Sequence, residues 1–459
     1  MSTLSSLYRA RFQPHLSKPV DVASLVAFRV LFGALLLWEV LRYFDHGWIH
    51  RQYIEPEFQF HYYGFGWLSP WPGAGMYVHF AGLGLLAVCI LVGVFYRLAA
   101  ALFFLGFTYV FLLDQANYLN HFYLVSLLSL LLVFLPAHRA ASLDAWRRPS
   151  LRSDVVPAWT VWLLRAQLAL VYAGAGVAKL NHDWLQGEPV RAWLDEAAVD
   201  ALLGKLLVQE WFVLVVVYGG LLFDLLVAPG LLWKRTRPLF LVLAAGFHLA
   251  NARLFDIGIF PWLALAATLV FLPPDWPRRV LNWPRRGIEA VPGPTRARVA
   301  ALAGAFLALQ FLVPLRHLLY PGNVHWTEEG HRFSWHMKLR DKELDEAVFE
   351  ARAADGSVTV LDPRDCLTKC QAEKMVLTPD MILQYGHHVA EELRREGKGD
   401  VEVRARVRVS LNGREPQLMI DPAVDLAAEP RSLAPARWIL PLETPLHGRP
   451  MGQRTESRE

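Results

Sequence analysis

The segment PAWTVWLLRAQLALVYAGAGVAK (residues 157–179) consists almost entirely of apolar and small residues and ends in a lysine. About 20 apolar residues are enough for an α-helix to cross the core of a bilayer. Similar blocks recur along the chain, and 54% of its 459 residues are hydrophobic, more than an ordinary soluble protein of this length carries. The segment therefore predicts a multi-pass α-helical membrane protein.

The apolar blocks predict about nine transmembrane helices. Many of the 17 Trp and 14 Tyr lie near block ends, as an aromatic belt at the membrane interfaces requires. The third and seventh blocks are short, and the seventh and eighth are barely separated, so these two could form a hairpin or a partly re-entrant pair. The predicted spans are residues 23–44, 74–95, 98–113, 118–136, 157–179, 211–233, 238–252, 254–272 and 299–319.

The basic residues of the connecting loops indicate an orientation. With a cytoplasmic N-terminus, the inner loops hold 17 Lys or Arg residues and the outer loops before residue 320 hold 4. Loops rich in Lys and Arg stay in the cytoplasm, so we expect a protein of the inner cell membrane whose C-terminal region lies outside the cytoplasm. We expect no cleavable signal peptide, so the first span would be an uncleaved anchor. A net charge of +4 argues against a nucleic-acid partner.

The chain becomes charged after residue 325 and contains short alternating runs. VEVRARVRVSL (401–411) predicts a half-buried strand, and NGR (412–414) predicts a turn after it. TPDMILQYGHHVAEELRREG (378–397) predicts a helix with Thr378 as its cap and Gly397 as its stop. We therefore expect a small α+β, strand-rich exterior domain. The predicted division is a transmembrane domain at 1–320, an exterior domain at 321–443 and a disordered tail at 444–459.

Three cysteines are too few for a disulfide framework. Cys89 lies within an apolar block and is predicted to be a packing residue. Cys366 and Cys370 lie in the exterior region and could form a bridge there, although a four-residue spacing is weak evidence for one.

Several ionisable residues fall inside predicted spans, where a charge is costly. Arg29, Arg165 and Asp224 lie at similar distances from the cytoplasmic ends of their spans. The similar depth makes an Arg–Asp pair inside the bundle possible, and we favour a structural role for such a pair over a functional one. Glu39 lies near the outer end of the first span and has no obvious partner.

A second polar set lies at the outer side. Asn120 and His121 begin the fourth span, Lys179 ends the fifth, and His248 and Asn251 end the seventh. These positions are far apart in sequence, but alternating spans place them at one depth. We therefore expect a site near the outer leaflet. No ligand spacing accompanies the two histidines, so we do not expect a metal ion.

Lys179 has two interpretations. A lysine at a helix C-terminus is favoured by the helix dipole and can extend to the interface as an anchor. The small residues before it, Gly176 among them, let a neighbouring helix or a ligand approach closely. Helical spacing puts Tyr172 and Gly176 on the face of Lys179, so the amine could instead point into a cleft. A desolvated amine there loses its proton more easily and could act as a general base.

Several segments resemble the vitamin K-dependent gamma-glutamyl carboxylases, in particular bacterial homologues with an HTTM-type membrane domain. The matches follow the family order over roughly residues 20–430. The resembling segments are NYLNHFYLVSLLSLLLVFLPAHRAASLD (117–144), YAGAGVAKLNHDWLQGEPV (172–190), FHLANARLFDIGIFPW (247–262), WTEEGHRFSWHMKLR (326–340), TPDMILQYGHHVAEEL (378–393) and SLNGREPQLMIDPAVDL (410–426).

The resemblance implies a two-part reaction that uses reduced vitamin K, O2 and CO2. Oxygenation of the reduced naphthoquinone to its epoxide drives proton removal from a peptide glutamate, which then adds CO2. The family's base maps to Lys179 and its partner histidine to His121, while Asn120 would help to polarise the quinone oxygen. We assign His248 and Asn251, together with Tyr172 and Gly176, to the lining of the quinone or oxyanion pocket.

The chain also departs from the animal members of this family. Only about 120 ordered residues are expected after the last span, which makes propeptide recognition of the animal kind doubtful. Ala178 stands where animal members tend to carry a second lysine. The expected partners are a peptide or protein glutamate and the lipid bilayer, and the oligomeric state stays open. The alternatives are a quinol monooxygenase or epoxidase without peptide carboxylation, and a non-enzymatic membrane binding or transport protein.

Overall fold

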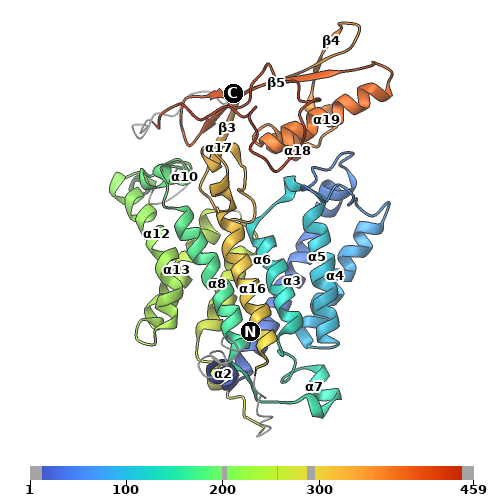
Figure 1. Cartoon of the computed structure of the whole chain (residues 1–459). Helices are drawn as coiled ribbons and strands as arrows, with labels where there is room; N and C mark the ends of the chain where they lie inside the picture. Colours follow the sequence, from blue (N-terminus) through green and yellow to red (C-terminus); the bar gives the residue numbers. More distant parts are fainter. Residues whose placement is uncertain (1–12, 199–203, 256, 287–294, 447–459) are drawn as a thin grey trace.

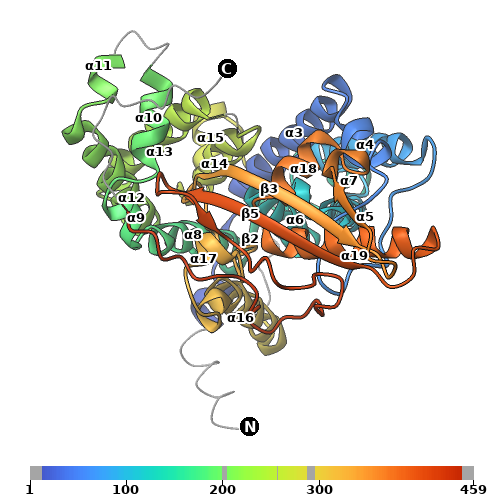
Figure 2. The same ribbon diagram turned by 90° about the horizontal axis from the view of Figure 1, so that it is seen from above.

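The computed structural model describes residues 13–198, 204–255, 257–286 and 295–446. Long helices stand side by side as a bundle, and a sheet with two helices lies across one end of it (Figure 1). Figure 2 shows strands β3 (Lys342–Arg352) and β5 (Glu402–Leu411) running across the bundle when it is seen from that end.

Six helices within the described residues are long and apolar enough to cross a membrane. They are α3 (Ala23–Asp45), α4 (Gly75–Val92), α5 (Tyr96–Leu113), α8 (Ala158–Ala178), α12 (Glu210–Leu232) and α16 (Ala297–Leu312) with its 3-10 extension η6 (Val313–Leu319). Shorter or more polar helices fill the other three predicted spans, namely α6 (Asn120–Phe134), α13 (Arg237–Leu254) and α14 (Phe260–Thr268). Each predicted span therefore contains a helix, and the predicted fold class is confirmed.

Short elements connect the long helices. They are α2 (Gln13–Ser17), β1 (Pro19–Asp21), η2 (His50–Ile54), η3 (Gln115–Asn117), α7 (Leu143–Arg147), η4 (Pro149–Leu151), β2 (Val155–Pro157), α9 (His182–Leu185), α10 (Val190–Ala198), α11 (Gly204–Leu207), η5 (Leu269–Phe271), α15 (Trp276–Leu281) and α17 (Val324–Thr327).

The bundle helices approach one another closely. Helix α3 packs against α4, α5 packs against α6, and α8 packs against α12. A Cβ atom on Gly33 of α3 would lie only 2.7 Å from the backbone nitrogen of Leu91 in α4. Glycine is therefore required at this contact, because any side chain would push the two helices apart.

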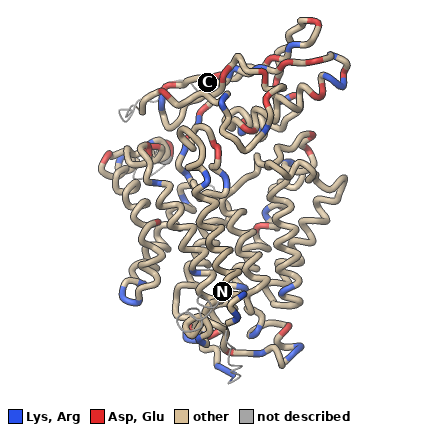
Figure 3. Tube along the Cα trace, viewed as in Figure 1, with Lys and Arg blue, Asp and Glu red and all other residues tan. Residues whose placement is uncertain are grey.

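The end of the bundle away from the sheet is rich in Lys and Arg (Figure 3). There the antiparallel ribbon of β1 and β2 is held by Arg278, whose guanidinium donates to Asp21 at 2.9 Å and to Asp154 at 2.8 Å. The described N-terminal segment lies at this end and the C-terminal domain lies at the other (Figure 1). This arrangement agrees with the alternation of spans from which the orientation was inferred.

The C-terminal domain contains a four-stranded antiparallel sheet in the order β4 (Val358–Leu361), β3, β5, β6 (Gln417–Leu418). Strand β5 is the predicted strand: alternate residues such as Val403 and Val407 are buried, and the arginines between them are more exposed. Helices α18 (Lys369–Met375) and α19 (Pro379–Arg395), preceded by η7 (Pro363–Asp365), form the rest of the domain. The buried side chains of α19 join those of β5 in one apolar core.

Some details differ from the predictions. Cys366 and Cys370 are free thiols, so the possible bridge is absent. Thr378 does occupy the N-cap position of α19, but its side chain makes no capping hydrogen bond. Most of the tail predicted to be disordered, 444–459, lies outside the described residues, and Thr444 accepts a hydrogen bond from Arg414 through its carbonyl oxygen.

Candidate active site

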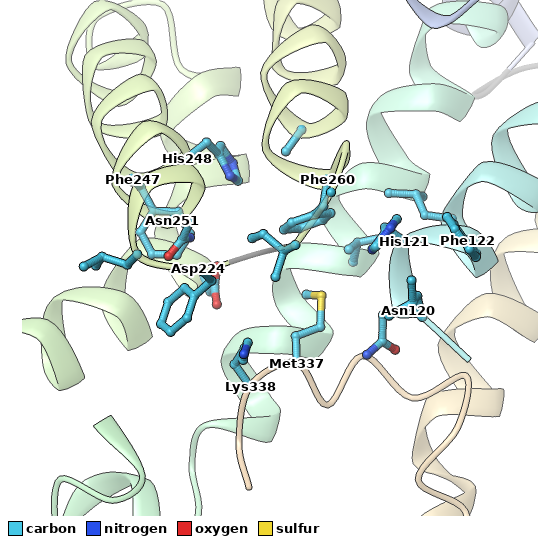
Figure 4. Close-up of a pocket in the computed structure, with 18 of the residues that line it drawn as sticks. Asn120, His121, Phe122, Asp224, Phe247, His248, Asn251, Phe260, Met337 and Lys338 are labelled. Atoms are coloured by element: carbon cyan, nitrogen blue, oxygen red, sulfur yellow. The ribbon is translucent and has the colours of Figure 1, made fainter. Parts of the chain in front are cut away.

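A cavity of about 540 Å³ opens between the helices at the end of the bundle nearest the C-terminal domain (Figure 4). This volume lies within the roughly 300–1,000 Å³ that is typical of small-molecule sites. Phe122, Phe247, Phe260 and Leu168 are among its apolar walls. Six of the seven site residues predicted from the sequence line it, namely Asn120, His121, Tyr172, Lys179, His248 and Asn251.

Lys179 is held inside the protein and does not extend toward lipid. It is the C-cap residue of α8, and only 6% of its surface is exposed. Its Nζ donates a hydrogen bond to Oδ2 of Asp224 at 2.6 Å and lies 5.0 Å from the centre of the Trp184 ring. The interpretation of Lys179 as an interfacial anchor is therefore wrong, and the cleft-facing interpretation fits the structure.

The possible Arg–Asp pair does not form, because Asp224 pairs with Lys179. Arg29 donates to the carbonyl oxygens of Ala137 and Ala141, and Arg165 donates to those of Val270 and Leu272, so both guanidinium groups bind backbone acceptors and not Asp224. Asp224 belongs to the Lys179 site instead, and this partner of the amine was missed. Asp224 was noticed in the sequence because it is an ionisable residue inside a span. Its partner was inferred from the number of residues to the cytoplasmic end of each span, and that count indicated an arginine instead of Lys179.

The reason for this difference lies in the unequal ends of the helices. Helix α9 folds over the end of α8, and its Trp184 donates from Nε1 to the carbonyl oxygen of Val217 in α12 at 3.1 Å. Helix α12 starts at Glu210, so about two of its turns extend past this level. Asp224 consequently lies level with the end of α8, although it is far from either end of α12.

His248 and Tyr172 form a second buried contact in the cavity. The Tyr172 hydroxyl lies 2.9 Å from Nε2 of His248, which joins α8 to α13. Nδ1 of His248 is buried and has no hydrogen-bond partner in the described protein. Asn251 lies one turn further along α13 and is half-buried. A polar ligand atom would satisfy a buried ring nitrogen that the protein leaves unpaired.

Asn120 and His121 occupy the start of α6. Oδ1 of Asn120 accepts from the Tyr118 hydroxyl at 2.9 Å, and its Nδ2 donates to the carbonyl oxygen of His336 at 3.3 Å. The His121 ring lies against Phe260, and within the described ranges it makes no hydrogen bond to protein. His121 can therefore offer a nitrogen to a ligand, whereas the Asn120 amide is engaged with the loop that covers the cavity.

Gly176 is placed differently from the other predicted residues. A Cβ atom on it would lie 2.6 Å from Cδ2 of Leu225, so Gly176 faces helix α12 and does not line the cavity. Its small size lets α8 and α12 approach closely enough for Lys179 to reach Asp224. Gly174 has a similar role toward the covering loop, because a Cβ atom there would lie 2.8 Å from Cδ1 of Trp335.

The loop of residues 326–340 covers the cavity, and we call it the covering loop. Glu328, Phe333, Trp335 and Lys338 all have positive φ angles between 52° and 62°. Such angles are unfavourable for residues with a side chain and persist only where surrounding contacts fix them. The Phe333 amide donates to the Tyr118 hydroxyl at 2.7 Å, and Trp335 is buried, so the bundle holds this loop in place.

Ion pairs anchor the covering loop to the C-terminal domain. Glu328 pairs with Lys342 at 3.0 Å and with Arg340. Burial would raise the pKa of Glu328, but the charges of Arg340 and Lys342 lower it to about 2. The carboxylate is therefore ionised at neutral pH, and the loop is fixed at its exterior end.

Two more charged groups at the cavity were missed or left unassigned. Glu39, which had no obvious partner, pairs with Arg42 at 2.8 Å, and the guanidinium of Arg42 lies 4.9 Å from the centre of the Trp48 ring. The three-residue spacing on one helix face would have predicted this pair. Lys338 of the covering loop also reaches the cavity, and nothing in its sequence context indicated this.

The described part of the chain contains no group of three or more His, Cys, Asp or Glu residues arranged to hold a metal ion. Four imidazole rings do gather beneath the C-terminal domain, with neighbouring centres 4.8–6.3 Å apart. They belong to His317, His325, His331 and His336.

Comparison with known families gives two matches in sequence. The model described as the HTTM domain matches residues 17–276, and the model described as the vitamin K-dependent gamma-carboxylase, lumenal domain, matches residues 295–445. Together they include every residue that lines the cavity, and the second match begins just before α16. No solved structure matches the chain significantly.

Proposed function

Because the chain belongs to the vitamin K-dependent gamma-carboxylase family, we propose that it couples oxygenation of a reduced naphthoquinone to carboxylation of a peptide glutamate. The observation that carries this proposal is the buried Lys179–Asp224 pair in an apolar cavity, formed jointly by membrane helices and by the covering loop. We propose that Lys179 is the catalytic base of this site.

The cavity suits a flat apolar ring with polar oxygens. Phe247 and Phe260 offer apolar faces, and His121 and His248 are among the residues that line the walls. Reduced vitamin K, once bound and oxygenated, supplies the strong base that removes a γ-proton from glutamate. We propose that His121 and His248 hold the ring oxygens and that Asn251 lines the same pocket.

The Lys179–Asp224 hydrogen bond provides a proton route. Transfer of one proton from the Lys179 ammonium to the Asp224 carboxylate would give a neutral pair and a free lone pair on Nζ. That lone pair can accept the proton of a quinol hydroxyl. Asp224 thus acts as the positioning residue for Lys179, and it keeps the amine inside the cavity where no bulk water competes for the proton.

Asn120 links this chemistry to the covering loop. Its amide donates to the carbonyl oxygen of His336, so the start of α6 and the loop keep a fixed relation. We propose that this contact orients the neighbouring His121 ring toward the quinone oxygen. The loop also excludes water, which would protect a carbanion at the glutamate Cγ from reprotonation.

We propose that the chain lies in the inner cell membrane with its N-terminus in the cytoplasm. The support is the gathering of Lys and Arg at the end of the bundle away from the C-terminal domain (Figure 3). In this orientation the quinone reaches the cavity from lipid, and the glutamate peptide reaches it from the exterior.

The test is a turnover assay of the purified chain in lipid nanodiscs. It supplies reduced vitamin K, O2, labelled bicarbonate and a glutamate peptide, and both the epoxide and label fixed in the peptide are expected. If epoxide forms without fixed label, the function is quinol oxygenation without carboxylation. Ala178, which stands where animal members of the family tend to carry a second lysine, is the sequence feature that points to this outcome. The absence of both products would overturn the enzymatic proposal.

A further inference from the structure

Lys338 differs from the other cations that line the cavity. Lys179 donates to Asp224, Arg42 pairs with Glu39, and Lys374 donates to the carbonyl oxygen of Ala116. The Nζ of Lys338 lies 4.7 Å from the centre of the Phe255 ring and 5.5 Å from that of Trp193. Among the cavity residues that the structure describes, Lys338 is therefore the cation that contacts aromatic faces but has no oxygen acceptor.

The surroundings of Lys338 leave its charge available. Partial burial lowers the pKa of Lys338, and the charges of Asp341 and Glu196 act in the opposite direction. The side chain is exposed, so its amine can meet a solute that enters the cavity. Contact with aromatic faces orients an ammonium group without supplying a counter-charge, so an incoming carboxylate can bind at the same position.

The backbone at Lys338 also points to a ligand. Its φ angle is +52°, in a region that residues with a side chain seldom adopt. The buried neighbours Trp335 and Leu339 hold this conformation on either side. Figure 4 shows Lys338 and Met337 projecting from the covering loop into the cavity beside Asp224. Strain that the surroundings maintain at a cavity wall is typical of residues that meet a ligand.

We propose that Lys338 binds the side-chain carboxylate of the substrate glutamate. This inference rests on the proposed function and adds the residue that recognises the anionic group. The covering loop joins the C-terminal domain to the cavity, so a cation on it meets a peptide that enters from the exterior. The other cations of the cavity already have acceptors, which leaves Lys338 to neutralise an additional negative charge.

The same contact would favour the reaction. Loss of the γ-proton leaves the C–H electron pair on the glutamate side chain, where the second negative charge spreads onto the carboxylate oxygens. The proton passes to the base that the oxygenated quinone supplies. An ammonium group at those oxygens stabilises the doubly charged species more than the singly charged ground state. It also suits the dicarboxylate product.

The test measures binding to the full-length chain in nanodiscs, with a glutamate peptide and the same peptide carrying glutamine as probes. The wild type should bind the glutamate peptide about tenfold more tightly. Lys338→Met and Lys338→Gln should reduce this preference to about twofold or less, whereas Lys338→Arg should keep it. Lys369→Met changes an exposed lysine on the C-terminal domain and should behave as the wild type.

Two outcomes would overturn the inference. One is a wild type that does not distinguish the two peptides, and the other is a Lys338→Met or Lys338→Gln variant that keeps the full preference for glutamate. Because binding needs no turnover, this result is separate from the proposed function. If the wild type forms epoxide and fixes label while the KM for the glutamate peptide is unchanged in Lys338→Met, only the assignment of Lys338 fails.

Discussion

Nζ of Lys179 lies 2.6 Å from Oδ2 of Asp224, and both side chains are buried. The two residues come from different helices, α8 and α12, which Gly176 allows to approach closely. Each charge is compensated only by the other, because no second salt bridge to either group occurs in the described part of the chain. They therefore behave as one unit in both stability and proton transfer.

Removing one partner of this pair should destabilise the protein. Lys179→Met leaves the Asp224 carboxylate buried without its counter-charge, which costs about 3–5 kcal/mol of unfolding free energy. The double variant Lys179→Met/Asp224→Leu removes both charges and should recover most of that loss. Thermal unfolding in detergent measures both effects, and neither variant should form epoxide. Equal stability of the single and double variants would show that the pair is not coupled.

A second buried pair should fasten the C-terminal domain to the bundle. Arg414 donates two hydrogen bonds to the Asp183 carboxylate, each at 2.6 Å, and Asn412 adds a third at 2.8 Å. Arg414→Ala leaves Asp183 with too few donors and should cost about 3–5 kcal/mol. The domain junction should then be cut faster in limited proteolysis.

Arg408→Ala is the matched control for this prediction. Arg408 pairs with Asp345 at 3.0 Å on the domain surface, where both side chains are substantially exposed. Its removal should change stability by only about 0.2–1 kcal/mol. Similar cleavage rates for Arg414→Ala and Arg408→Ala would contradict the assignment of Arg414 to the junction.

The contact of the covering loop with α8 should tolerate no added side chain. Gly174→Ala places a methyl group 2.8 Å from Trp335, and displacement of the loop should cost about 1–3 kcal/mol and lower activity. Gly219→Ala, in open space on α12, should be neutral or slightly stabilising. Unfolding temperature and turnover provide the measurement, and a Gly174→Ala variant as active and stable as Gly219→Ala would refute this packing role.

The four-histidine cluster should make stability depend on pH. Burial lowers the pKa of His325 from 6.5 to about 3 and that of His336 to about 2. The folded protein therefore keeps both rings neutral, while the unfolded chain binds protons below pH 6.5. Their contribution to stability is fully present above pH 6.5 and is lost as the pH falls toward about 3. His325→Gln should flatten the fall of the unfolding temperature between pH 6.5 and 4, and an unchanged slope would disprove it.

The helices and strand β5 were predictable because their patterns are local. Apolar length alone indicates spans such as α8, and the alternation of valine and arginine indicates β5. The convergence of His121, Lys179 and His248 was also predictable, since each lies near a helix end on the same side. The alternation of spans is enough to predict that helix ends on the same side of the membrane lie near one another.

The Lys179–Asp224 pair and the covering loop could not be predicted in this way. The position of Asp224 depends on how far α12 extends past the end of α8, and loop lengths do not reveal this. The positive φ angles of Trp335 and Lys338 depend on tertiary contacts, because neither residue type favours that conformation. The charge of Lys338 at the cavity follows from this loop geometry, not from a motif.

The most direct test of the central claim is epoxide formation by Lys179→Arg in nanodiscs, with reduced vitamin K and O2 supplied and compared with the wild type. Arginine keeps a positive charge for Asp224 but cannot accept a proton at neutral pH. Since general-base catalysis typically contributes about 10²–10⁴-fold, the account predicts a loss of at least about 10²-fold in a variant that still folds. Epoxide formation within about threefold of the wild type would contradict the role of Lys179 as the base.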